Sequence, residues 1–289
     1  MNHAAVPSAV SSSRLLRPGE RIAVAYFAYT AMLSVVFSRT WLHQAVSVAL
    51  PLALWWLGTI AARYRRLGIE MAREWATPAL VLTGYLQLEW FSRAPDPGLQ
   101  NRFFGWDQWL LHAVGFGELV RSGGSPLHWL LELSYTLLYT IPPLSLAAIY
   151  WLRRRQRVDR FLATFTLGTF CVYALLPLFP TLAPRVAFPG QDLPATTNVW
   201  RSFNLWLLGN FDISTSVFPS GHVAVAFSSA FGLIRAVPDC PRLCAAGLTA
   251  AALVLLATIY GRYHYAADGC ASFLISVAAW RLSEAWDER

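Results

Sequence analysis

The sequence contains no lysine, and all 23 of its basic residues are arginines. Charged residues of either sign are scarce, at 13% of the chain, against about 25% in a soluble domain. Hydrophobic residues make up 56%, and the mean hydropathy is +0.42. This composition predicts a membrane protein. The net charge of +7 does not indicate a nucleic-acid partner, because the arginines lie in short clusters between apolar runs.

Cysteine is also rare, and its four positions form no pattern. Cys171 and Cys270 lie inside apolar runs, and Cys240 and Cys244 fall in a predicted turn. This spacing predicts neither a disulfide framework nor a zinc site. No cleavable signal peptide is evident, since the first apolar run is too long. Residues 1–20 are expected to form a disordered tail.

Eight apolar runs are candidates for membrane-spanning helices, which need about 20 residues to cross the hydrocarbon. They cover residues 22–38, 41–62, 75–91, 127–152, 161–179, 222–237, 243–260 and 266–282. Pro142 and Pro143 are expected to kink the fourth run. The predicted fold is an all-α polytopic membrane helical bundle. Its predicted parts are the tail, N-terminal transmembrane helices over 21–92 and a catalytic membrane domain over 93–289.

The arginine clusters predict the orientation, because basic residues are enriched in cytoplasmic loops. Clusters at 14–21, 63–73, 153–160 and 235–242 fall on one side, together with both termini, and this side is predicted to be cytoplasmic. Linkers 39–40, 93–126, 180–221 and 261–265 then lie on the non-cytoplasmic face. Linker 93–126 is aromatic and amphipathic, which fits either a helix in the headgroup plane or packing onto the end of the bundle.

One candidate motif lies at the start of the sixth run, where Pro219, Ser220, Gly221 and His222 follow one another. Ser220 can cap a helix, and Gly221 lets a ligand approach the backbone. The free amides of a helix start favour an anion, which His222 in the first turn would then face. The alternative is an ordinary helix cap with an interfacial histidine.

A second candidate motif lies before the eighth run, where His264 and Asp268 are four residues apart and share one helix face. A carboxylate bonded to one ring nitrogen leaves the other nitrogen with a free lone pair. The alternative is a structural hydrogen bond between helix ends. Arg185 and Arg262 are predicted on the same face, and arginine matches phosphate oxygens, although either could be a headgroup anchor.

Together these residues fit phosphoryl transfer, which needs cationic clamps, a nucleophile and an acid for the leaving oxygen. Zinc bound by the two histidines and the aspartate is the competing chemistry, and the adjacent arginines disfavour a cation there. We therefore predict no metal and no cofactor.

The two motifs resemble the second and third signature motifs of the type 2 phosphatidic acid phosphatase superfamily, and Arg185 falls where the arginine of the first motif belongs. The stretches 180–185 and 262–268 are closest to the inositol phosphorylceramide synthase and sphingomyelin synthase branch. Two positions depart from the superfamily pattern. Leu178 stands where the first motif has lysine, and Ala257 and Thr258 stand where the third has Ser-Arg.

The resemblance covers roughly residues 100–283 and implies a six-helix catalytic core. It also implies that His264 is the nucleophile of a phosphohistidine intermediate, that Asp268 orients it and that His222 protonates the leaving alcohol. The residues implied to hold the phosphate are Arg185, Ser220, Gly221 and Arg262.

The predicted activity is therefore cleavage of a membrane phospholipid or lipid phosphate, with transfer to a hydroxyl acceptor on a lipid, a polyol or water. A lipid phosphotransferase is the first hypothesis, and a lipid phosphate phosphatase is the alternative. A non-catalytic lipid-binding or transport protein is the second alternative, for which Glu89 and Glu132 are the acidic candidates inside apolar runs.

Overall fold

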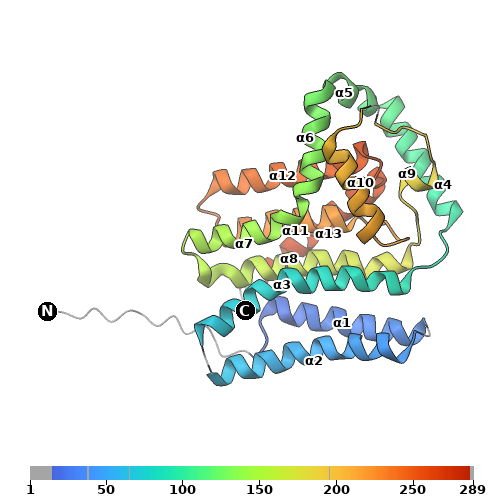
Figure 1. Cartoon of the computed structure of the whole chain (residues 1–289). Helices are drawn as coiled ribbons and strands as arrows, with labels where there is room; N and C mark the ends of the chain where they lie inside the picture. Colours follow the sequence, from blue (N-terminus) through green and yellow to red (C-terminus); the bar gives the residue numbers. More distant parts are fainter. Residues whose placement is uncertain (1–14, 38, 65, 195, 287–289) are drawn as a thin grey trace.

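A computed structural model describes residues 15–37, 39–64, 66–194 and 196–286, and every regular element within these ranges is helical (Figure 1). The all-α prediction is therefore confirmed. The expected tail lies mostly outside the described residues, as does Ser38 at the end of the first run. Residues 18–20 already belong to the first helix.

Eight helices cover the eight apolar runs along their length or in part. They are α1 (Pro18–Val36), α2 (Trp41–Tyr64), α3 (Leu67–Leu86), α7 (Ile141–Trp151), α8 (Val158–Leu175), α11 (Gly221–Ala236), α12 (Pro241–Tyr260) and α13 (Ala266–Glu284). Three stretches are long and apolar enough to cross a membrane: α2, Arg155–Leu178 around α8, and α12. The prediction of eight spans is not confirmed, because the described residues contain three such stretches, and α7 and α11, with 11 and 16 residues, are shorter than a span requires.

The axes of these eight helices are roughly aligned in Figure 1, with the chain running back and forth, and they form a bundle with two ends. Linkers 64–67, 151–158 and 236–241 lie at one end, with the end of α13; we call this the arginine end. The linkers that carry the two histidine motifs lie at the other end, which we call the motif end. The structure thus agrees with the prediction that both motifs share one end of the bundle.

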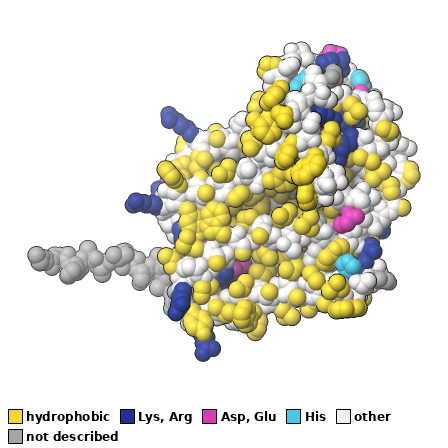
Figure 2. Space-filling model, viewed as in Figure 1, with side chains coloured by type: hydrophobic (Ala, Val, Ile, Leu, Met, Phe, Trp, Pro, Cys, Tyr) yellow, Lys and Arg dark blue, Asp and Glu magenta, His cyan; other side chains and the backbone are white. Residues whose placement is uncertain are grey.

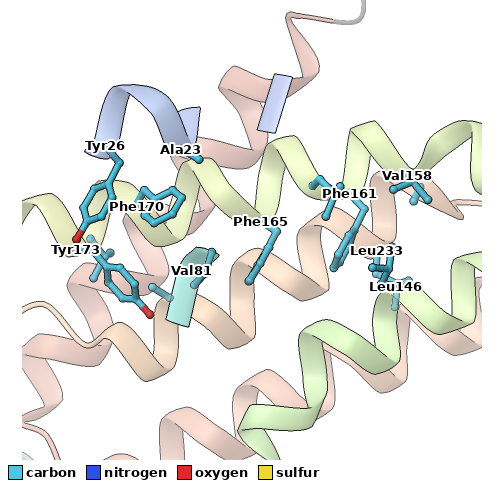
Figure 3. Packing of buried hydrophobic residues seen from close by; sticks show 14 of the residues in the cluster. Ala23, Tyr26, Val81, Leu146, Val158, Phe161, Phe165, Phe170, Tyr173 and Leu233 are labelled. Atoms are coloured by element: carbon cyan, nitrogen blue, oxygen red, sulfur yellow. The ribbon is translucent and has the colours of Figure 1, made fainter. Parts of the chain in front are cut away.

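The core of the bundle is built around α8, which packs against α11, α1 and α13. Its aromatic side chains Phe161, Phe165 and Phe170 are buried between these helices (Figure 3). Helices α8 and α11 approach closely at Gly232, where a Cβ atom would lie 2.8 Å from the carbonyl oxygen of Phe161. The buried surface of α8 therefore fixes where α11, and with it His222, lies.

Ion pairs at the arginine end join three segments that are distant in sequence. Arg73 on α3 donates to Glu20 on α1 at 2.7 Å. Arg17 lies 2.7 Å from Glu74 and 3.1 Å from Asp159 on α8. Other basic side chains project from this end into the surroundings, and broad hydrophobic areas cover the surface between the two ends (Figure 2). Apolar surface of this extent is the surface expected of helices in contact with lipid.

The fourth apolar run is broken into two helices rather than kinked, which corrects the sequence prediction. Helix α6 (Gly124–Leu137) is followed by the 3₁₀ turn η3 (Leu138–Thr140), and α7 starts anew with Pro142 and Pro143 in its first turn. Proline is tolerated there because first-turn amides have no intrahelical acceptor. The two helices point in clearly different directions, and α6 crosses the motif end of the bundle (Figure 1).

A layer of short helices covers the motif end (Figure 1). It contains α4 (Pro97–Gln108), the π-turn η2 (Trp109–Ala113), α5 (Phe116–Ser122), α9 (Pro184–Ala187) and α10 (Val199–Phe211). The remaining 3₁₀ turns are η1 (Gln87–Phe91), η4 (Arg155–Arg157) and η5 (Leu176–Leu178). In α4, Phe103 is buried and packs on Phe218 and Tyr265, while Trp106 is exposed. Segment 93–126 thus packs on the bundle with one face and presents aromatic side chains outward with the other.

Candidate active site

The two histidines of the motifs meet at the motif end of the bundle. His222 lies in the first turn of α11, and His264 lies in the loop between α12 and α13. Nδ1 of His222 is 3.0 Å from Nε2 of His264, and the ring centroids are 5.2 Å apart. Both side chains are buried. The structure therefore brings together two residues that are 42 positions apart in the chain.

The loop that carries His264 is shaped by the end of α12. The amides of Tyr263 and His264 both donate to the carbonyl oxygen of Thr258, at 3.0 and 3.1 Å. Arg262 has a φ of 58°, in the left-handed region that turns the chain sharply. The chain then enters α13, where Asp268 lies in the first turn. Thr258, at a position that departs from the superfamily pattern, thus holds the loop with its backbone.

His264 is oriented by two acceptors on its Nδ1 side. This nitrogen is 3.2 Å from Oδ2 of Asp268 and 3.1 Å from the carbonyl oxygen of Val217. Because neither partner can donate, we assign the proton to Nδ1, which leaves the lone pair on Nε2 facing His222. Burial lowers the pKa of His264 to about 4. The ring is therefore neutral near pH 7, as a nitrogen nucleophile must be.

Ser220 and Gly221 shape the start of α11. The hydroxyl oxygen of Ser220 accepts from the amide of Val223 at 3.3 Å, as predicted for an N-cap. The amide of Ser220 donates to the carbonyl oxygen of Asp268 at 3.2 Å, which ties the two motifs together. At Gly221 a Cβ atom would lie 3.0 Å from the ring of Tyr173. Only a small residue fits here beside His222.

Arg185 lies beside the loop that carries His264. It is on α9, and its amide donates to the carbonyl oxygen of Arg262 at 3.2 Å. Its guanidinium lies over the ring of Tyr263 at 5.5 Å and is 3.7 Å from Asp212. Its buried Nη1 has no hydrogen-bond partner within the described residues. Arg185 thus retains a donor for an anion next to the histidine pair.

The side chain of Arg262 is placed apart from the other predicted residues. Its Nη1 is 2.5 Å from Oδ2 of Asp107, whose Oδ1 accepts from the amide of Ala266 at 2.8 Å. Arg262 lines a separate cavity with His112 and Tyr260. Its ion pair links α4 to the start of α13, so the structure favours a role in supporting the loop.

Four residues that the sequence analysis did not single out surround the histidine pair. Tyr85 and Asp212 line the small cavity between His222 and His264, and Tyr85 donates its hydroxyl to Asp212. Tyr135 and Tyr139 contact the far side of His222, at 3.2 and 3.3 Å from Nε2. Asp212 could have been noticed as an acid in the same linker as Arg185. The tyrosines offered no signal within an aromatic-rich sequence.

The two acidic residues inside apolar runs are held by structural partners. Glu132 on α6 lies 2.9 Å from Arg201 and accepts from Asn204 at 2.8 Å and from the hydroxyl of Tyr263 at 2.6 Å. Glu89 accepts from the amide and hydroxyl of Ser214 at 2.7 and 2.8 Å. The Glu132 contacts join α6 to α10 and to the loop before His264, and the Glu89 contacts join η1 to the segment before α11, so both acids have structural partners. Among the described residues, no group of three or more His, Cys, Asp or Glu side chains is placed to hold a metal ion.

Comparisons with known proteins agree with this geometry. The sequence profile of the PAP2 superfamily matches residues 102–282. A PA-phosphatase related-family protein of Dictyostelium discoideum is 29% identical over 128 residues, which are 42% of this chain and 22% of that relative. No solved structure matches the chain. The profile spans more than half of the sequence and includes both histidine motifs and Arg185, so this chain belongs to the PAP2 superfamily.

Proposed function

We propose that this protein is a lipid phosphotransferase that works through a phosphohistidine on His264, as in the inositol phosphorylceramide synthase branch. Membership of the superfamily already indicates action on lipid phosphates by phosphatase or phosphotransferase chemistry. The observation that carries the proposal is the placement of His264, whose Nδ1 faces Asp268 and whose Nε2 lies 3.0 Å from a second histidine.

In the first half-reaction, Nε2 of His264 attacks the phosphorus of the substrate, and the bond from phosphorus to the leaving oxygen breaks. His222 gives a proton to that oxygen from its Nδ1, the nitrogen that lies 3.0 Å from Nε2 of His264. In the second half-reaction, the acceptor hydroxyl attacks the phosphohistidine and returns a proton to His222. Asp268 stays bonded to Nδ1 of His264 throughout and stabilises the charge that develops on the ring.

The phosphate oxygens are held from two sides in this proposal. Arg185 offers its unpaired Nη1, and the first amides of α11, at Gly221 and His222, lie at the positive end of the helix dipole. Ser220 contributes through its cap, which keeps this turn in shape. Arg262 does not contact the phosphate in this proposal. Its ion pair with Asp107 holds the loop that carries His264 in place.

The lipid part of the substrate has a matching cavity of about 290 Å³ beside His222. Its walls come from α3, η3, α7, α8 and α11 and are mainly apolar, with residues such as Val81, Leu138, Phe165 and Val225. An apolar cavity next to the proton donor suits a leaving or entering alcohol that carries a hydrocarbon chain.

The acceptor is tested by incubating the purified protein in lipid nanodiscs with a phospholipid labelled in its phosphate, with and without a ceramide or diacylglycerol. A labelled lipid product that appears only with the alcohol is the expected result. Release of water-soluble labelled phosphate at the same rate with and without the alcohol would instead establish the phosphatase. No turnover of any phospholipid or lipid phosphate would favour the non-catalytic alternative.

The zinc alternative is tested by adding excess chelator to the same assay. Full activity is expected, and loss of activity would favour a zinc site.

The proposed topology places the motif end on the non-cytoplasmic face and the arginine end in the cytoplasm, following the positive-inside rule. A background without the four native cysteines allows a direct test. In intact cells, a membrane-impermeant maleimide is expected to label Arg121→Cys at the motif end and to spare Arg66→Cys at the arginine end. Both sites are exposed, so both should react after lysis. The reverse pattern in intact cells would overturn the orientation.

A further inference from the structure

His222 has two tyrosine hydroxyls on the side of its ring that faces away from His264. The hydroxyl of Tyr135, on α6, is 3.2 Å from Nε2, and that of Tyr139, in η3, is 3.3 Å from the same nitrogen. The ring of Tyr135 also lies 5.1 Å from the imidazole. Both tyrosines come from the break between α6 and α7, so this break delivers them to the site.

The hydrogen bond from Tyr135 has a definite direction. Tyr135 is fully buried, with 0% of its surface exposed. Nε2 of His222 is the one hydrogen-bond partner that its hydroxyl has in the part of the chain that the structure describes. A buried hydroxyl that did not donate would leave its proton unpaired, which is unfavourable because the group has also lost its contact with water. Tyr135 therefore donates, Nε2 accepts, and the ring proton of His222 is on Nδ1.

The other side of the ring leads to the same assignment. Nδ1 of His264 faces two acceptors, Asp268 and the carbonyl oxygen of Val217, and must donate. Nε2 of His264 is then an acceptor, so Nδ1 of His222 must supply the proton of the 3.0 Å contact between the rings. A single direction of donation thus runs from Tyr135 through both histidines to Asp268.

We propose that Tyr135 and Tyr139 are positioning residues that keep the proton-donating nitrogen of His222 directed at the reacting phosphate. This inference rests on the proposed function of His222 as the acid. A phenol can accept as well as donate, so the tyrosines serve both protonation states of the ring. When His222 is an imidazolium, Nε2–H donates to a tyrosine oxygen, and Nδ1–H faces the phosphate.

Burial lowers the pKa of His222 to about 3, so the ring is neutral without substrate and must take up a second proton, from water, when the anionic phosphate binds beside it. The proton count then closes over one cycle that begins with His222 as an imidazolium. In the first half-reaction the proton on Nδ1 passes to the leaving oxygen as the phosphorus forms its bond to His264, and His222 keeps the proton on Nε2 against the tyrosines. In the second half-reaction the acceptor hydroxyl returns a proton to Nδ1. The Nε2 proton is never transferred, which is why a fixed hydrogen-bond partner at that nitrogen suffices.

The two tyrosines do not contribute equally. Tyr135 is stacked against Tyr263, with ring centroids 4.3 Å apart, and its position is fixed by the core. Tyr139 is 45% exposed and lines the apolar cavity beside His222. Removal of the hydroxyl from Tyr135 should therefore have the larger effect, and removal from Tyr139 a smaller one.

The kinetic test compares Tyr135→Phe, Tyr139→Phe and the double variant with Tyr29→Phe. Tyr29 is a matched control, because its hydroxyl donates to the carbonyl oxygen of Ala174 on a different part of the bundle. Tyr135→Phe is expected to lower kcat for lipid esters with alkoxide leaving groups about tenfold, the effect of one lost hydrogen bond. KM and turnover of a nitrophenyl ester should stay close to the parent values. Equal loss for both ester types would contradict the proposal.

A second measurement does not depend on turnover. The ¹⁵N chemical shifts of the His222 imidazole, in protein labelled at histidine, report which nitrogen carries the proton. For the neutral ring of the substrate-free protein we expect the proton on Nδ1 in the parent and a mixture of tautomers in the double variant. A proton on Nε2 in the substrate-free parent would overturn the proposal even in an active enzyme. If the protein shows these ¹⁵N shifts but turns over no lipid, the role of the tyrosines is supported and only the proposed function is contradicted.

Discussion

Replacement of His264 by alanine is expected to lower turnover of a lipid phosphate by about 10⁴-fold or more, the order seen when a covalent nucleophile is removed. The variant keeps Arg185 and the start of α11, so the lipid should still bind. Without the imidazole of residue 264, no phosphohistidine can form. The measurement is the rate of labelled product formation, together with trapping of an acid-labile phosphoenzyme, which should be absent from the variant.

His112→Ala is the matched control for this experiment. His112 also pairs with an aspartate, lying 2.9 Å from Asp192, but it lies in the outer layer and is largely exposed. Its replacement should leave turnover near the parent value. If His264→Ala retained parent-level turnover, or still formed the acid-labile phosphoenzyme, His264 could not be the nucleophile.

The same nucleophile makes a prediction about pH. Attack requires the unprotonated ring, so phosphoenzyme formation falls as the pH drops through the pKa of His264. Burial lowers this pKa to about 4, so the limb set by His264 should lie near pH 4 rather than near the ordinary value of 6.5. Single-turnover phosphoenzyme formation between pH 3.5 and 8 measures it. A fall in the rate centred near pH 6.5 would contradict the burial of the His264 ring that the structure shows.

Replacement of His222 by alanine is expected to have the second large effect on turnover. For substrates with an alkoxide leaving group, the rate is expected to fall about 10²–10⁴-fold, the usual contribution of a positioned acid. An ester of the same lipid with a nitrophenolate leaving group needs little protonation and should lose far less. The difference arises because only the poor leaving group requires the proton on Nδ1.

The control for His222 is the ratio of the two rates within each variant, since a change in binding or folding would lower both alike. His264→Ala serves as the comparison, because loss of the nucleophile should reduce both esters to background. Equal losses for both esters in His222→Ala would contradict the role of His222 as acid and leave it as a residue that only shapes the site.

Much of the bundle could be predicted from sequence, because apolar runs and arginine clusters report directly on the environment of each helix. The helices of the motif-end layer were harder. Helix α10 is capped by Asn198, whose side chain accepts from the amide of Arg201, but a 13-residue helix has no clear signal inside a long linker. The break at Pro142 was predicted only as a kink, because the sequence does not tell whether a proline bends a helix or begins one.

Some features of the candidate site could likewise be predicted from the sequence, and others could not. The meeting of His222, His264 and Asp268 at one place could be predicted, because the residues lie in short, regular spacings at helix starts; their catalytic roles stay a prediction. Asp212 and the surrounding tyrosines were not, since their contacts cross from other elements and depend on how α3 and α6 pack. Arg262 was predicted to bind phosphate only because it lies next to the second histidine motif in the sequence. That position does not show that its guanidinium pairs with the buried carboxylate of Asp107 on α4.

Helix α3 lies wholly before residues 102–282, which the family profile matches. Its last turns nevertheless supply Tyr85 to the histidine cavity and Val81 and Leu82 to the apolar cavity beside His222. One wall of the surface against which a hydrocarbon chain would rest is therefore encoded in a different stretch of the gene from the histidine motifs, while the other walls lie within residues 102–282. Sequence change at Val81 and Leu82 alters that wall without touching the histidine motifs, so relatives that share every signature residue need not share a preferred lipid.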